Sequence, residues 1–207
     1  MTDSKKLISV IETIAQVMHE NKEFLTELDS AIGDSDHGIN LDRGFQAVSE
    51  KLKSLESSNV DDILKAIGMT LISTVGGASG PLYGTAFLKA ATVVKGQTNI
   101  DAQNFINMLK EAIDGIQYRG KAHRGEKTML DSLIPAYETL ADEYKRSKDF
   151  VSAMEKAITS AAAGVEYTKH IIATKGRASY LGERSLTHQD PGATSAMLLL
   201  RAILNSL

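Results

Sequence analysis

Apolar residues recur at intervals of three and four positions along most of the chain, and this interval is typical of amphipathic α-helices. The first run, from Leu7 to Met18, follows polar residues that can begin a helix. Similar runs predict eight or nine helices and no convincing strand. Short connections favour antiparallel neighbours, so the expected fold is all-α, an up-and-down bundle or a helical barrel. The runs cover residues 7–18, 24–28, 41–55, 61–71, 81–94, 101–118, 129–147, 150–174 and 191–204.

Single residues mark several of the expected helix ends. Asp61 can cap the fourth helix, and Pro81 suits the first position of the fifth, where proline sacrifices no hydrogen bond. Thr128 can cap the seventh helix, whereas Pro135 lies inside its pattern and predicts a kink or a displaced start. Pro191 opens the last helix.

Length, charge and cysteine content narrow the class of protein. The 207 residues contain no linker rich in proline, glycine and serine, so one domain spanning residues 1–207 is expected. A formal charge of -3 and a pI near 6.0 leave no basic footprint for nucleic acid. The sequence shows neither a long apolar run nor a signal-peptide pattern, which argues against a membrane protein. With no cysteine in the chain, a cytoplasmic location is expected.

Three carboxylates lie close together in the stretch LDSAIGDSDHGINLDRGF, between two predicted helices: Asp29, Asp34 and Asp36. Like charges ~4 Å apart repel by about 4 kcal/mol at an effective dielectric near 20, so the cluster is either well solvated or holds a cation. Oxygen ligands favour Mg²⁺ or Ca²⁺. An EF-hand is excluded because Ile39 and Phe45 stand where its glycine and glutamate belong. The alternative is a solvated loop that caps two helices.

Two glycine-rich segments are candidates for anion binding. In GGASG, backbone N–H groups, the Ser79 hydroxyl and the dipole of the next helix could cradle a phosphate. A small-residue turn between closely packed helices would have the same composition. Residues 175–192 form an unpatterned segment with Arg177 and Arg184, planar donors suited to phosphate, and Asp190 as an acceptor. The alternative there is a solvated charged loop.

The sequence offers no P-loop. GIQYRGKA comes within one residue of that motif, but Ala122 stands where a serine or threonine should bind Mg²⁺, and a predicted helix precedes it instead of a strand. An acidic loop, a glycine-serine segment and a basic loop on a helical frame therefore indicate Mg-nucleotide binding without a P-loop. Phosphoryl transfer requires mainly positioning and charge neutralisation, which such loops can supply.

Four longer motifs, in this order, resemble one family of phosphotransferases: GDSDHGINLDRGF, GGASGPLYGT, RGKAHRGEKTMLD and GRASYLGERSLTHQDPGATS. The chain looks like the nucleotide-binding L subunits of dihydroxyacetone kinase (DhaL), and the similarity spans residues 28–196. The resemblance implies a barrel of eight antiparallel helices with the nucleotide at one end. It also implies the separate-subunit form that depends on the phosphotransferase system, because the chain has no dihydroxyacetone-binding part.

The resemblance implies the site residues as well. Asp29, Asp34 and Asp36 match the ligands of two Mg²⁺ ions that bridge the nucleotide phosphates. Ser35 stands at a position that is often glycine or alanine in the family. The residues that match contacts to ADP are His37, Gly38, Ile39 and Asn40 around the phosphates, Ala78 and Ser79 in the anion loop, and Gly120, Met129, Arg177, Asp190, Pro191 and Gly192 elsewhere.

The mechanism implied by the resemblance is a relay. ADP stays bound as a coenzyme, accepts a phosphoryl group from a phosphohistidine of the partner DhaM, and passes it as part of ATP to dihydroxyacetone held on the partner DhaK. No general base is recognisable in this chain, so we expect it on DhaK. Both partners should dock around the mouth formed by the acidic loop and residues 175–192.

Three alternatives stay open at this level. The chain could be a kinase subunit that exchanges free ATP in each turnover, or a non-catalytic, nucleotide-dependent regulatory module. In the third alternative, His37 itself carries the phosphate, since an imidazole next to Asp36 is suited to nucleophilic chemistry.

Overall fold

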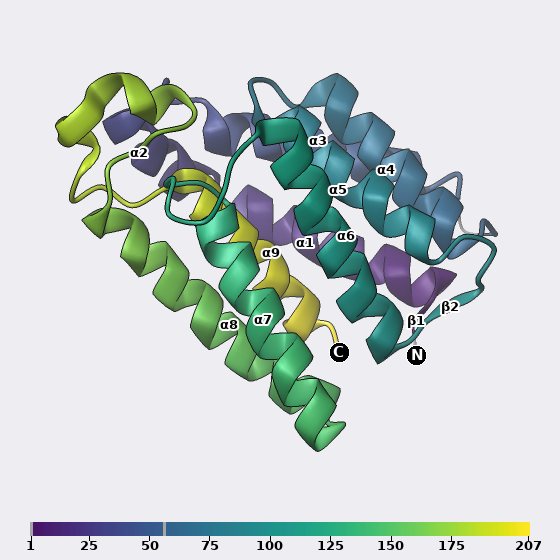
Figure 1. Cartoon of the computed structure of the whole chain (residues 1–207). Coiled ribbons are helices and arrows are strands. Elements are labelled where there is room, and N and C mark those ends of the chain that lie inside the picture. Colours follow the sequence, from purple (N-terminus) through teal and green to yellow (C-terminus); the bar gives the residue numbers. More distant parts are fainter. Residues whose placement is uncertain (1, 56) are drawn as a thin grey trace.

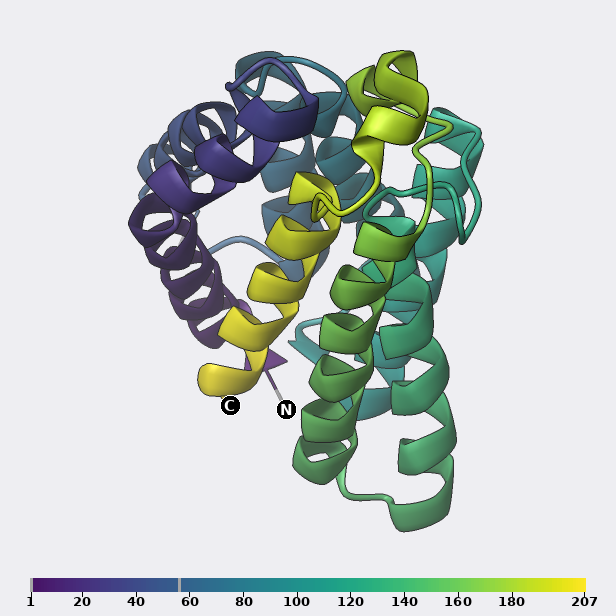
Figure 2. The same ribbon diagram turned by 90° about the vertical axis from the view of Figure 1, so that its left-hand side faces the viewer.

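The computed structural model describes residues 2–55 and 57–207. Over these residues the chain forms nine α-helices, and eight of them pack side by side in a closed ring (Figures 1 and 2). The all-α expectation is thereby confirmed. The helices are α1 (Ser4–Glu20), α2 (Lys22–Ile32), α3 (His37–Leu52), α4 (Val60–Thr74), α5 (Ser79–Val93), α6 (Ala102–Gly120), α7 (Leu130–Ser147), α8 (Phe150–Tyr167) and α9 (Pro191–Asn205).

The ring follows the chain order and closes where its two ends meet. Helices α3 to α9 each contact the next, α9 contacts α1, and α1 contacts α3. The eight helices alternate in direction, so each helix of this up-and-down barrel is antiparallel to both of its neighbours (Figure 2). The short helix α2 is not part of the wall. It lies across one end, against α3 and α9 (Figure 1).

A two-stranded pairing was not expected from the sequence. β1 (Thr2–Asp3) pairs antiparallel with β2 (Asn99–Ile100), and Thr2 lies opposite Ile100. Two residues carry no readable alternation, which is why the pattern missed both strands. The pair joins the start of the chain to the α5–α6 connection at the end of the barrel away from α2 (Figure 1).

Three expected helix starts differ from those observed. α4 begins at Val60 with Asn59 as its N-cap residue, so Asp61 lies inside the first turn. α5 begins at Ser79, two residues before Pro81. Residue propensity alone does not fix a helix end to the exact residue, because tertiary contacts also decide where the first turn begins. Pro81 still lies in the first turn, where its missing N–H costs nothing.

In α7, Met129 rather than Thr128 occupies the N-cap position, and the Thr128 hydroxyl accepts from the Leu130 N–H at 3.2 Å.

The long helix expected at residues 150–174 ends early. α8 stops at Tyr167, and a 3-10 turn, η1 (Thr168–His170), follows it. The segment expected to be non-periodic contains a second 3-10 element, η2 (Arg177–Ser185), which is interrupted at Gly182. We call residues 168–190 the cap segment. It covers the same end of the barrel as α2, as Figure 2 shows.

Pro135 lies within α7 and does not displace its start. The helix runs from Leu130 to Ser147. Proline has no N–H, so the carbonyl of Asp131, four residues earlier, has no helical donor. Gly164 of α8 packs against that carbonyl so closely that a Cβ there would overlap the oxygen. The proline and the glycine together let α7 and α8 approach at this level.

The barrel interior is apolar. Phe45, Leu41 and Leu71 from neighbouring helices are fully buried and belong to one continuous cluster that reaches all eight ring helices. A cavity of about 290 Å³ lies inside the ring, and its walls include Ile14 and Leu200. Among the described residues no helix is long and apolar enough to cross a membrane.

Candidate functional site

Four ring helices begin at the same end of the barrel. The first turns of α3, α5, α7 and α9 line one pocket of about 410 Å³, at His37, Ser79, Leu130 and Pro191 respectively. Each helix start carries unpaired N–H groups and a partial positive charge of roughly half an elementary charge. Four such ends around one pocket make a strong anion site.

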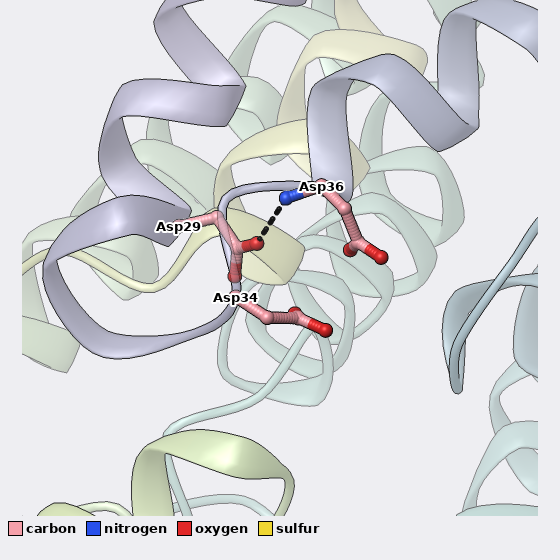
Figure 3. A group of neighbouring side chains, drawn as sticks. All are labelled: Asp29, Asp34 and Asp36. Carbon is pink, nitrogen blue, oxygen red and sulfur yellow. Dashed lines mark hydrogen bonds between the residues drawn. The ribbon is translucent and has the colours of Figure 1, made fainter.

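The three aspartates predicted to bind metal meet at the rim of this pocket. One carboxylate oxygen from each of Asp29, Asp34 and Asp36 lies within 4.8 Å of the other two. Asp29 comes from the last turn of α2, whereas Asp34 and Asp36 come from the loop before α3. In Figure 3 the side chains of Asp34 and Asp36 point the same way. A spacing of this kind suits oxygen ligands of one or two hard divalent cations.

The local backbone explains how the loop presents these side chains. Asp29 Oδ2 accepts from the backbone N–H of Asp36 at 2.9 Å (Figure 3). It also accepts from the backbone N–H of His37 at 3.2 Å, so Asp29 caps α3 although it belongs to α2. The Asp36 side chain makes no capping bond and is left free. Ser35 adopts a left-handed conformation with φ 62°. That conformation favours glycine, so the surrounding loop must hold Ser35 in it.

The acidic loop carries excess negative charge that Arg177 partly neutralises. Partial burial raises the pKa of Asp34, and the charge of Asp36 adds to this, while the guanidinium of Arg177 opposes it. Arg177 Nε lies 2.7 Å from Asp34 Oδ2. A basic side chain therefore occupies part of the position where a metal cation would neutralise the same carboxylates.

His37 is a buried link between three helix starts. Its Nδ1 lies 3.1 Å from Ser79 Oγ in α5, and its Nε2 lies 2.9 Å from Ser195 Oγ in α9. Ser195 donates to the Gly192 carbonyl and lies 2.7 Å from the hydroxyl of Tyr83. Burial lowers the pKa of His37. A neutral ring with Nε2–H satisfies this network, with Nδ1 accepting from Ser79.

The other walls come from distant parts of the chain. Ala78 and Ser79 belong to the start of α5. Gly120 ends α6, and Met129 is the last residue of the α6–α7 loop, which we define as residues 121–129. Asp190 Oδ2 caps α9 by accepting from the Ala193 N–H at 2.6 Å. Burial raises the pKa of Asp190 to about 7. The predicted residues that line the pocket are Asp29, Asp34, Asp36, His37, Ala78, Ser79, Gly120, Met129, Arg177, Asp190, Pro191 and Gly192.

Three predicted contact residues lie behind this wall. Gly38 packs against the Lys22 carbonyl of α2, where a Cβ would overlap the oxygen. Ile39 is half exposed at 49%, and the Asn40 side chain accepts from Arg43 at 2.7 Å. None of the three is among the residues that line the pocket. Gly38 brings α2 and α3 together, which places Asp29 beside the start of α3.

Sequence reasoning missed several residues of the site. Arg119 and Lys127 line the pocket, and Ser195 and Tyr83 hold His37. All four residues fall inside the quoted motifs, but neither their spacing nor their type distinguishes them from ordinary helix and loop residues. Their roles could be found only from the fold, because it brings together segments that lie far apart in the chain. Arg184, which was thought suited to phosphate, is exposed and does not line the pocket.

Comparison with known proteins shows which proteins this chain resembles. The chain is 41% identical over 198 residues to the PEP-dependent dihydroxyacetone kinase, ADP-binding subunit DhaL, of Escherichia coli, covering 96% of this chain and 94% of the relative. It is 45% identical over 189 residues to the corresponding subunit of kinase 1 of Listeria innocua, covering 91% of this chain and 89% of the relative.

The fold matches a larger solved protein. The dihydroxyacetone kinase of C. freundii superimposes with a TM-score of 0.76 at 24% identity, over 97% of this chain and 34% of the kinase. Its complex with AMP-PNP and Mg²⁺ gives a TM-score of 0.74 at 23% identity, over 97% and 33%. The chain thus spans about a third of that kinase. The model of the DAK2 domain matches residues 31–205. This chain belongs to the DAK2 domain family.

Proposed function

We propose that this chain is the ADP-binding subunit of a PEP-dependent dihydroxyacetone kinase. The observation that carries the proposal is the pocket itself, where three carboxylates face the starts of four helices. An anion and a divalent cation are both needed to satisfy such a site, and a Mg-nucleotide supplies both. The relatives in Escherichia coli and Listeria innocua support it, because they are ADP-binding DhaL subunits that match this chain over nearly their whole length.

The proposed roles follow from the charges of the residues. Asp29, Asp34 and Asp36 hold two Mg²⁺ ions, and the helix starts at His37 and Ser79 donate N–H groups to phosphates. When bound, the nucleotide carries the phosphoryl group and Mg²⁺ neutralises its charge. The other proposed nucleotide contacts are Ala78, Gly120, Met129, Arg177, Asp190, Pro191 and Gly192, which line the pocket. Gly38, Ile39 and Asn40 do not line it, so their proposed contribution is limited to forming the start of α3, whose N–H groups face the pocket. We take residues 1–207 as one nucleotide-binding domain.

The contacts of His37 favour a positioning role over that of phosphate carrier. Both ring nitrogens lie at hydrogen-bond distance from serine hydroxyls, so neither is free to attack a phosphoryl group. In the proposed relay, the phosphoryl group passes from DhaM to the bound ADP and then from ATP to dihydroxyacetone held on DhaK. Both partners dock around the pocket mouth, in the cytoplasm.

The first test is to ask what the purified protein retains. The washed protein is denatured, with and without prior chelation of Mg²⁺, and the released nucleotide is quantified by anion-exchange chromatography. Near-stoichiometric ADP that chelation removes, with two Mg²⁺ per ADP, is expected. ADP absent from the washed protein, with only weak ATP binding, would favour the subunit that exchanges free ATP. An assay with DhaK and phosphorylated DhaM that yields no dihydroxyacetone phosphate would favour the regulatory module.

Substitutions test the carboxylates directly. Asp34→Asn and Asp36→Asn should each weaken Mg-dependent ADP binding by about a hundredfold or more, because each removes a proposed metal ligand. The helical content should stay unchanged by circular dichroism. Asp62→Asn, an exposed aspartate in the first turn of α4, is the control and should bind ADP normally. Near-normal affinity in both site variants contradicts the proposal.

A further inference from the structure

Lys127 is a lysine enclosed almost completely by the protein. Only 2% of the residue is exposed. Its ammonium donates to three backbone carbonyls, those of Thr168 at 2.6 Å, Ser185 at 2.7 Å and His188 at 2.6 Å. A fourth carbonyl, that of Ile171, lies at 3.4 Å. Across the described residues, no carboxylate lies within 4.0 Å of this ammonium.

Such a group is stable only because its donors are filled. An ammonium has three N–H donors, and three short contacts use all of them. Burial lowers the pKa of Lys127, while Asp190 and Asp131 favour its charged form. The backbone of Lys127 is left-handed, with φ 62°. A non-glycine residue keeps such a conformation only where its surroundings hold it there.

The three carbonyls span the whole cap segment. Thr168 begins it, Ser185 ends η2, and His188 precedes the cap of α9. Within the cap segment only Ala173 and Ala178 are buried apolar residues, and they form a small cluster with Ile32. Directional hydrogen bonds to one ammonium therefore replace the apolar packing that holds the barrel helices together.

Lys127 also connects two walls of the pocket. It belongs to the α6–α7 loop. Met129 of this loop and Gly120, which precedes it, line one side of the pocket. The cap segment supplies Arg177 and Asp190 to the same pocket. Further links run parallel to it at Glu126. Its carbonyl accepts from the Thr174 N–H at 3.3 Å, and its carboxylate accepts from the Thr174 hydroxyl at 3.3 Å and lies 3.9 Å from Lys175 Nζ. These contacts are longer than the three short bonds of the ammonium, and they all reach one turn of the cap segment, whereas Lys127 reaches three separate parts of it.

We propose that Lys127 is a positioning residue for nucleotide binding, whose ammonium folds the cap segment over the pocket and holds Arg177 and Asp190 in its wall. The inference rests on the proposed function, because the ligand that benefits is the Mg-nucleotide. Lys127 acts through the backbone carbonyls of the cap segment. Without the ammonium, the nucleotide itself would have to order that segment, and its apparent affinity would fall by the fraction of closed molecules.

The first experiment compares Lys127→Met with Lys145→Met, an exposed lysine of α7. Hydrogen exchange is followed by mass spectrometry in the absence of nucleotide, and ADP affinity by calorimetry with Mg²⁺. In Lys127→Met, exchange over residues 168–190 should rise about tenfold or more while α1 and α4 stay protected, and the Kd for ADP should rise about tenfold or more. Unchanged exchange overturns the proposal, and so does an open cap segment with unchanged affinity. Lys145→Met should match the wild type.

The second experiment separates the ammonium from simple packing. In Lys127→Ala, added propylammonium supplies the three missing carbons and the N–H donors, whereas tetramethylammonium supplies the charge without donors. Propylammonium alone should restore protection of the cap segment and part of the ADP affinity. Restoration by both cations, or by neither, overturns the proposed role of the hydrogen-bonded ammonium.

A measurement on the wild-type protein covers the case in which both variants fail to fold. With ¹⁵N-labelled lysine, the Lys127 ammonium should give a slowly exchanging signal, and a freely exchanging one overturns the proposal. These readouts need no nucleotide. A wild-type protein that binds no ADP would refute the proposed function, while hydrogen exchange and the ammonium signal would still test Lys127.

Discussion

The barrel and the cap segment that covers one end of it are stabilised by different forces. The barrel buries a continuous apolar cluster drawn from all eight of its helices. The cap segment buries Thr168 and Ser185 beside two alanines and encloses the Lys127 ammonium. Apolar burial adds up with area and depends little on direction, whereas each hydrogen bond depends on its geometry. A substitution in the barrel core should therefore lower stability in proportion to the apolar area that it removes. In the cap segment, loss of a single hydrogen-bonding group should have a large effect.

This difference matches the division of work in the molecule. The barrel supplies stability and brings four helix starts to one end, while the cap segment and the acidic loop supply charged side chains that line the pocket. Segments that close over a ligand are generally drawn from the less stable part of a protein. Substitutions in the two regions should therefore separate stability from binding.

The largest effect on stability is expected in the barrel. Phe45→Ala removes a fully buried ring, so the free energy of unfolding should fall by about 3–5 kcal/mol. Urea denaturation followed by circular dichroism measures it, and the folded variant should bind Mg-ADP normally. Phe24→Ala, at 45% exposure in α2, is the control and should cost less than about 1 kcal/mol. Equal losses in the two variants would contradict the central role of the barrel core.

The second effect on stability comes from the buried carboxyl that caps α9, and it depends on pH. The pKa of Asp190 is about 7 in the folded protein, against a usual value of 3.8, so the folded state keeps a proton that the unfolded chain releases. Without nucleotide or Mg²⁺, the free energy of unfolding should therefore fall as pH rises from about 4 to 7, by at most about 1.4 kcal/mol per pH unit, and level off above.

Asp190→Asn should remove this pH dependence, because asparagine keeps the cap and carries no proton to lose. Asp149→Asn is the matched control. Asp149 caps α8 by accepting from the Ser152 N–H at 3.1 Å and is exposed, so its replacement should leave the pH profile as in the wild type. If the free energy of unfolding of the wild type did not fall between pH 4 and 7, the raised pKa of Asp190 would be refuted. The same slope in Asp190→Asn as in the wild type would also refute it.

The smallest effect on stability is expected from Arg177. Its side chain is 66% exposed, and exposed ion pairs contribute about 0.2–1 kcal/mol, so Arg177→Gln should change the free energy of unfolding by less than about 1 kcal/mol. Its affinity for Mg-ADP should still fall several-fold, by calorimetry, because a donor from the pocket wall is lost. Arg184→Gln removes an exposed arginine of the same segment outside the pocket and should bind normally. Equal affinities in the two variants would remove Arg177 from the site.

Local pattern alone predicted the helices of the barrel. Leu7 to Met18 falls within α1, and the runs after residues 101 and 150 begin within one residue of α6 and α8. These helices bury one face each, so the apolar interval survives in the sequence. The early end of α8 did not follow from the pattern, because the Thr168 carbonyl that follows it is taken by Lys127, a residue 41 positions away.

The candidate site divides in the same way. The sequence by itself determined the clustered carboxylates, the glycine-serine segment and the Asp190–Pro191 start of α9, because the chemistry of each lies in consecutive residues. Only the tertiary structure decided that these segments face one pocket, that Ser195 and Tyr83 hold His37, and that Lys127 closes the cap segment. Those contacts join residues tens of positions or more apart. Closing the ring of eight helices is what brings them together, and no local pattern records where a ring closes.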